Sequence, residues 1–170
     1  FFTKVKKGII LEDDIEITYA AMQFLSDGLD IFKNENNIAS ISAYTEHPNY
    51  QNSETLKSMY SFMFHSWGWS TWKKKWEKFN HLEENNYVVN PNHELFKSNN
   101  SLTKNFQKIL NKCRKGEIIT WDYQFQNFCL LNRYMNVLPT FPLINNLGFG
   151  DEYAENCRHE TSFKNRFIDN

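Results

Sequence analysis

The acidic triplet Glu12-Asp13-Asp14 is the group of residues in this 170-residue chain that is best suited to chemistry. It follows a short apolar run at 8–11, which predicts a buried, central strand with the acids at its open end. Three adjacent carboxylates repel one another unless a cation lies among them, and Mg²⁺ or Mn²⁺ prefers oxygen ligands of this kind. The alternative is a solvated acidic turn before a helix, where negative charge suits the helix dipole. The triplet alone favours neither interpretation.

The segment Trp67-Gly68-Trp69 is a second candidate. Indoles offer flat apolar faces and one N–H donor each, which suits the mixed polarity of a sugar ring, and glycine lets the backbone approach a ligand. Since most isolated tryptophans belong to cores, the alternative is that both indoles are structural. We expect at least one of them to border the same cleft as Asp14.

Asp122 is the third candidate. Thr120 is suited to capping a helix, which would put Asp122 in the first turn of that helix. A carboxylate held there can accept a proton from an acceptor hydroxyl as a general base, although an acid at a helix start more commonly interacts with the dipole alone. A fourth segment, 145–152, has two glycines around an aromatic residue and predicts a tight loop, and it lacks the lysine of a phosphate-binding loop. The histidines show no metal-ligand spacing.

Apolar spacing predicts the elements that would position these residues, in the strand–helix–strand order of an α/β unit. We expect an amphipathic helix after the acids and then a strand at 38–42. Ser70 or Thr71 is expected to cap a helix that carries Trp72, Trp76 and Phe79, after a strand at 60–64. Two more helices are expected over 102–113 and 121–129, followed by short apolar runs at 137–138 and 143–144.

The composition suits one packed domain or a large part of one, with 41% hydrophobic residues. A net charge of −1 gives no overall field that favours nucleic acid or a membrane. No signal peptide is visible, and no run reaches the ~18 apolar residues of a transmembrane segment. Three widely spaced cysteines disfavour a zinc ribbon and favour a reducing compartment. We therefore expect a cytoplasmic protein, with the inner membrane surface as the alternative location, and no nucleic-acid partner.

Taken in order, four segments resemble one family. They are a strand ending in Leu-Glu-Asp-Asp, then Trp-Gly-Trp-Ser-Thr-Trp, then Thr-Trp-Asp-Tyr-Gln, then a proline-containing stretch into Asn-Leu-Gly-Phe-Gly. This order is similar to that of bacterial nucleotide-diphospho-sugar transferases sometimes labelled hemolytic-protein-like. Those enzymes are similar in plan to the N-acetylglucosaminyltransferase that initiates complex N-glycans. The resemblance covers 1–155, which it implies is a partial GT-A glycosyltransferase domain, and leaves 156–170 as a polar tail.

The resemblance implies the carboxy-terminal part of a GT-A fold, an α/β architecture, without its amino-terminal nucleotide-binding half. It implies that Asp14 binds Mn²⁺ or Mg²⁺, while Glu12 and Asp13 face the nucleotide. Trp67-Gly68-Trp69 would then line the donor-sugar and acceptor region, and Asp122 would be the catalytic base. The implied reaction is an inverting transfer from a nucleotide-sugar donor to a hydroxyl of a glycan or another acceptor.

Two departures from the family pattern bear on activity. The family has its base-recognising half before the acidic strand, whereas this chain begins almost directly on that strand, so we expect further sequence upstream and a fragment inactive by itself. The family often has a histidine shortly after Gly-Phe-Gly, where Glu155 stands here, and His159 is the nearest substitute. The competing interpretation is a non-catalytic carbohydrate-binding or structural module.

Overall fold

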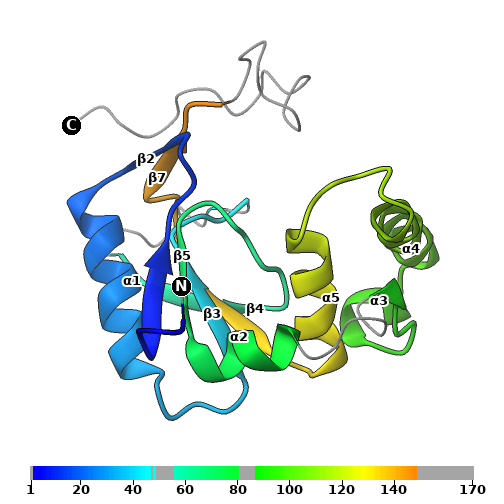
Figure 1. Cartoon of the computed structure of the whole chain (residues 1–170), viewed down its shortest axis with the longest axis horizontal. Helices are drawn as coiled ribbons and strands as arrows, with labels where there is room; N and C mark the ends of the chain where they lie inside the picture. The colour runs from blue at the N-terminus through cyan, green and yellow to red at the C-terminus, as the bar shows by residue number, and fades with distance from the viewer. Residues whose placement is uncertain (1, 47, 49–55, 81–86, 149–170) are drawn as a thin grey trace.

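The computed structural model describes residues 2–46, 48, 56–80 and 87–148. Within them the chain forms a mixed five-stranded sheet flanked by helices and a separate two-stranded sheet (Figure 1). The α/β class expected from the sequence is confirmed. The tail at 156–170, Glu155 and His159 lie outside the described residues. No helix in the described part of the chain is both long and apolar enough to cross a bilayer.

The strands of the larger sheet run in the order β1-β5-β3-β6-β4. Strands β3 and β6 are parallel, and the other neighbouring pairs are antiparallel. The bounds are β1 Lys7–Ile10, β3 Ile38–Ser42, β4 Ser58–Ser61, β5 Trp69–Trp72 and β6 Met135–Pro139. The smaller sheet pairs β2, Ile15–Ile17, with β7, Ile144–Asn146.

Strand β1 lies at an edge of the sheet, because β5 is its only strand partner among the described residues. The expectation of a central strand at 8–11 is therefore wrong. Its residues are half-buried or exposed, whereas all five residues of β3 are buried. A short apolar run indicates that a strand is covered by other elements, but it does not reveal how many strand neighbours it has.

The residues expected to begin a helix at Ser70 or Thr71 instead form β5, and the helix α2 starts at Lys73 and runs to Asn80. Both hydroxyls are buried in the sheet: Ser70 donates to the Leu25 carbonyl at 3.3 Å and Thr71 donates to the Ala39 carbonyl at 2.7 Å. Serine and threonine suit both helix starts and buried strands when a carbonyl is within reach. Here the tertiary partner decides the outcome.

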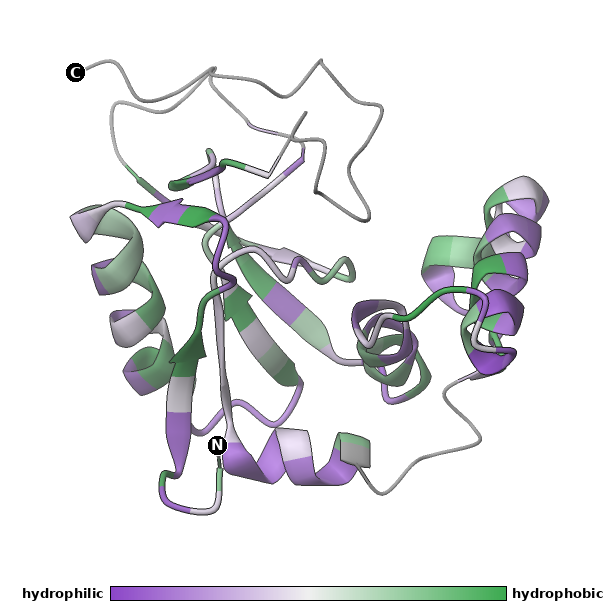
Figure 2. Cartoon of the chain, turned by 45° about the horizontal axis from the view of Figure 1, so that its top comes forward, coloured by the Kyte–Doolittle hydropathy of each residue, from purple (hydrophilic) through white to green (hydrophobic). Residues whose placement is uncertain are grey.

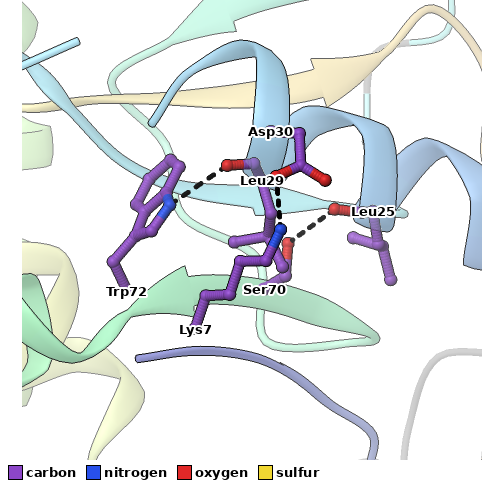
Figure 3. Close-up of polar contacts among 6 residues, drawn as sticks. All are labelled: Lys7, Leu25, Leu29, Asp30, Ser70 and Trp72. Atoms are coloured by element: carbon purple, nitrogen blue, oxygen red, sulfur yellow. Dashed lines mark hydrogen bonds and ion pairs between the residues drawn. The ribbon is translucent and has the colours of Figure 1, made fainter. Parts of the chain in front are cut away.

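Helix α1, Tyr19–Ile31, covers one face of the sheet, and α5, Asp122–Leu131, lies on the other side with α2 (Figure 1). Close polar contacts fix α1 on the strands: besides the Ser70 bond, the Trp72 indole donates to the Leu29 carbonyl at 3.2 Å, and Lys7 pairs with Asp30 (Figure 3). Thr18 caps α1 by accepting from Ala21 at 3.1 Å. It also donates to the Leu143 carbonyl at 2.9 Å, which joins the start of α1 to the approach of β7.

The two faces of the sheet carry two cores. Trp72 and Ile41 pack with Leu25 and Leu29 of α1, while Trp69 packs with Phe125 and Phe128 of α5 and with other residues. A third, smaller core forms between α5 and two further helices, α3 at Glu94–Lys97 and α4 at Asn100–Arg114. The thiols of Cys113 and Cys129 are free and buried, and burial raises the pKa of both, so neither is activated as a nucleophile.

The side chain of Gln126 in α5 forms hydrogen bonds that hold the segment between β4 and β5 in place. Its side-chain carbonyl accepts from the Phe64 amide at 2.5 Å, and its amide group donates to the Phe62 carbonyl at 2.8 Å. Gln107 of α4 does the same for another segment, because it accepts from the Val89 amide at 2.9 Å and donates to the Tyr87 carbonyl at 2.8 Å. Gln126 is buried and Gln107 is half-buried.

We expect Gln126→Leu to lower the free energy of unfolding by about 2 kcal/mol or more, because each buried backbone group left without a partner costs about 1–3 kcal/mol. The matched variant Gln107→Leu should cost about 1 kcal/mol, since water can replace its bonds. Urea unfolding followed by circular dichroism measures both. An equal loss in the free energy of unfolding for the two variants would contradict the prediction that the buried glutamine contributes more to stability than the half-buried one.

Candidate functional site

The acidic triplet forms the turn between β1 and β2, and β7 lies alongside it. Ile15 of β2 is opposite Asn146 of β7, and the Leu147 amide donates to the Asp14 carbonyl at 2.8 Å. The structure therefore brings together the first and fourth segments singled out in the sequence, although more than a hundred residues separate them. The sequence did not predict β2, which is the strand that makes this contact.

Gly148 lies directly against the Asp14 side chain. A Cβ built at Gly148 would lie 2.3 Å from Asp14 Oδ2, a distance that no side chain can occupy. The Gly148 amide donates to Asn146 Oδ1 at 2.8 Å, which holds the turn in place. A larger residue here would force the Asp14 side chain to move, so glycine allows the close approach of backbone to carboxylate. This backbone forms one wall beside Asp14.

Glu12 is the most strongly perturbed carboxyl of the triplet. Burial raises its pKa first, and the negative charge of Asp14 raises it next. A hydrogen bond with Ser66 lowers the pKa, while the charges of Asp122 and Asp13 raise it further. The pKa rises to about 7, so burial, and after it the neighbouring carboxylates, hold a proton on Glu12 up to about neutral pH.

Asp122 lies close enough to the triplet for its charge to act on Glu12. It begins α5, and its Oδ1 accepts from the Tyr123 amide at 2.8 Å and from the Thr120 hydroxyl. The predicted capping role of Thr120 is wrong, because Trp121 occupies the cap position and makes no side-chain capping bond. The Thr120 hydroxyl instead donates a hydrogen bond to the Asp122 carboxylate and orients it.

The turn Trp67-Gly68 packs beside the residue that precedes the acids. Gly68 has φ +61°, a left-handed conformation that favours glycine, and a Cβ there would lie 3.7 Å from Leu11 Cδ2 and 3.5 Å from Ile144 Cγ2. Trp67 is half-buried, and its ring centroid is 4.6 Å from that of Tyr44. Trp67 and Gly68 are therefore held next to the start of the triplet and the start of β7.

Trp69 belongs to the core. It is 1% exposed, it stacks on Trp121 with a centroid distance of 5.4 Å, and it meets Phe64 edge-on at 5.0 Å. Its indole nitrogen has no hydrogen-bond partner among the described residues. The resemblance implies a sugar contact at Trp69, but in this structure Trp69 has almost no exposed surface with which a sugar could make contact. Of the two tryptophans, only Trp67 retains exposed area.

Sequence reasoning missed Ser66, Tyr44 and the exact function of Gly148. Ser66 bonds Glu12, and its segment is fastened by Gln126. Tyr44 follows β3 and packs against both Trp67 and His65. No short motif marks these residues, because each acts through a neighbour that is distant in sequence. The only available signal is their position next to the predicted ends of strands, where ligands bind in open α/β sheets.

The acids suit a cation in charge but do not form a complete protein cage. In the described part of the chain, no three His, Cys, Asp or Glu side chains are arranged to hold a metal ion. Glu12 and Asp14 interact closely, and Asp13 and Asp122 add negative charge. This donor set fits a Mg²⁺- or Mn²⁺-type ion held by one or two carboxylates together with phosphate oxygens of a ligand. Asp14 is the residue of the triplet that would hold it.

No protein-family model and no curated protein matches this chain.

The raised pKa of Glu12 predicts how stability depends on pH. Folding favours the protonated form, so the stability gained is fully present below pH 4.5 and is lost as the pH rises through about 7. At pH values above 7, we expect Glu12→Gln to raise the temperature of the thermal unfolding midpoint. Below pH 4.5, the substitution should leave that temperature nearly unchanged. Glu16→Gln, at an exposed position of β2, is the matched control. The assignment fails if both variants shift the midpoint equally at each pH.

Proposed function

We propose that this chain is the sugar-handling part of a metal-dependent, GT-A-type glycosyltransferase that moves a sugar from a nucleotide-diphosphate donor to an acceptor hydroxyl. The observation that carries the proposal is that the fold brings the triplet after β1 near Asp122 at the start of α5, so that the charges of Asp14 and Asp122 add to the effect of burial on Glu12. Like charges gathered from separate elements raise the energy of the folded protein, and such costs are typical of sites that bind a cation or a substrate.

The triplet serves the donor in this proposal. A bound divalent ion supplies charge neutralisation for the diphosphate leaving group. Asp14, fixed between β2 and the Gly148 backbone, is the ligand of that ion. Glu12 and Asp13 face the nucleotide, and the Ser66 bond keeps Glu12 directed at the site.

Asp122 serves the acceptor. An oxygen of the acceptor hydroxyl forms a bond to the anomeric carbon of the donor sugar as the bond to the diphosphate oxygen breaks, and the hydroxyl proton moves to Asp122. Direct displacement of this kind inverts the anomeric configuration. The bonds from Thr120 and Tyr123 to Oδ1 support this role, because they fix the carboxylate before the substrate arrives. Trp67, which is half-buried, would offer an apolar surface to a sugar ring.

A non-catalytic carbohydrate-binding module is the second candidate. It is favoured by one observation, the absence of a three-ligand metal group among the residues that the structure describes. Such a module would use Trp67 in the same way, but it would need neither a metal nor a nucleoside diphosphate. Binding measurements therefore separate the two functions.

In the full-length enzyme, we expect isothermal titration of uridine diphosphate to show binding with Mn²⁺ and little or none without it. Asp14→Asn should abolish the metal-dependent part, because it removes the charge that holds the ion. Asp27→Asn, at an exposed position of α1, should leave binding unchanged. Metal-independent binding of a free sugar, with no response to the nucleotide, would favour the carbohydrate-binding module.

In the full-length enzyme, Asp122→Asn should lower the rate of sugar transfer by about 10²–10⁴-fold, the usual contribution of general-base catalysis, while donor binding stays nearly intact. Thr120→Val should have a smaller effect in the same direction, because it only loosens the carboxylate. Glu117→Gln, an exposed acid in the same loop, is the control. A loss below about threefold for Asp122→Asn would return this residue to the role of a helix-start acid.

A further inference from the structure

The end of the sheet opposite to the acidic triplet is rich in lysine. Three segments meet there: the start of β1, the connection from α1 to β3, and helix α2. Contacts join them, since the Lys73 amide donates to the Lys6 carbonyl at 2.9 Å and the Lys74 side chain donates to the Lys33 carbonyl at 3.2 Å. Figure 2 shows α2 as a largely hydrophilic helix beneath the strands. We call this surface the lysine face; its lysines are Lys4, Lys6, Lys7, Lys33, Lys73, Lys74 and Lys78.

Acids in the same segments do not neutralise the lysine face. They are Asp30, Glu35 and Glu77, and two of them are already paired with its lysines, Asp30 with Lys7 and Glu77 with Lys73 at 3.5 Å. The acidic triplet is also too far away to cancel it. Five residues of extended chain separate Lys7 from Glu12 by roughly 16 Å, about twice the Debye length of ~8 Å at physiological salt. A chain of net charge −1 therefore has one strongly basic end.

Two exposed apolar side chains lie within the lysine face. Val5, between Lys4 and Lys6, is 40% exposed, and Ile31, beside Asp30 at the end of α1, is 69% exposed. Lysines surrounding exposed aliphatic groups are the combination that binds a lipid surface, where the charges meet anionic headgroups and the apolar groups enter the interface. A nucleic acid would use the lysines but would gain little from Val5 and Ile31.

We propose that the lysine face docks this protein onto a bilayer surface that contains anionic phospholipid, with the acidic triplet directed away from the membrane. The orientation follows from charge, because the same surface that attracts the lysines repels Asp13 and Asp14. The proposal does not depend on sugar transfer, so it can hold or fail independently of the proposed function.

Co-sedimentation with vesicles tests the proposal on the whole chain. We expect binding to vesicles of phosphatidylcholine mixed with phosphatidylglycerol, weakening as salt is added, and no binding to phosphatidylcholine alone. Lys4→Glu, Lys6→Glu and Lys33→Glu together should weaken binding by about a hundredfold or more, since each lysine near an anionic surface contributes a factor of about five. These positions are exposed, and circular dichroism confirms that the variant folds.

The matched control reverses three exposed lysines of α4, Lys104, Lys108 and Lys112. It changes the net charge equally, and its effect should stay below about fivefold because the lysine face is intact. Equal losses for both triple variants would overturn the proposal, as would a failure of the unaltered chain to bind the mixed vesicles.

The apolar residues separate a membrane from a nucleic acid. Val5→Ser with Ile31→Ser should weaken vesicle binding by about tenfold and leave any binding to duplex DNA unchanged. If this pair has no effect on vesicles, and duplex DNA is bound as tightly as the mixed vesicles, the lysine face is a nucleic-acid surface and the membrane proposal is wrong.

Discussion

The burial of β5 between β1 and β3 is the constraint on which the rest of the structure depends. All four of its residues are buried, so their side chains must enter a core on each face and the two hydroxyls need hydrogen-bond partners. Trp69 and Trp72 fill the two cores, and Ser70 and Thr71 bond to carbonyls of α1 and β3. Because α1, β1 and β3 are all attached to this strand, the ends of β1 and β5 that carry Glu12 and Gly68 have fixed positions.

The candidate site combines hydrogen bonds that stabilise the folded protein with repulsion between carboxylates that destabilises it. Gln126 fastens the segment before Ser66, and Ser66 bonds Glu12, so a buried amide of α5 supports a carboxyl at the end of β1. Against this, burial and then the negative charges of Asp14 and Asp122 raise the pKa of Glu12. A rigid scaffold that maintains mutual repulsion is suited to receiving positive charge, because a cation relieves a strain that the fold already contains.

The sequence predicts the larger elements well because their causes are local. The strand at 38–42 and the helices around 22–32 and 102–113 follow from apolar runs and helical spacing, and the structure confirms them. The strand at 69–72, the edge position of β1, and the strands β2 and β7 were not predicted, since each depends on a partner far along the chain. Ser66 and Gly148 share that dependence. The nearness of Asp122 to Glu12 could be expected only from the order of the four segments.

The joining of β2 to β7 has a kinetic consequence. The bond from Thr18 to the Leu143 carbonyl spans 125 residues, and the strand pair beside it closes a loop of similar length. Contacts of such high sequence separation form slowly, because chain entropy is lost before the contact is made. During synthesis the acids leave the ribosome long before Gly148, so their contact waits until more than a hundred further residues have been made. We therefore infer that the acidic turn reaches its native shape only once β7 has been made, together with the core that contains Leu143 and Ile144.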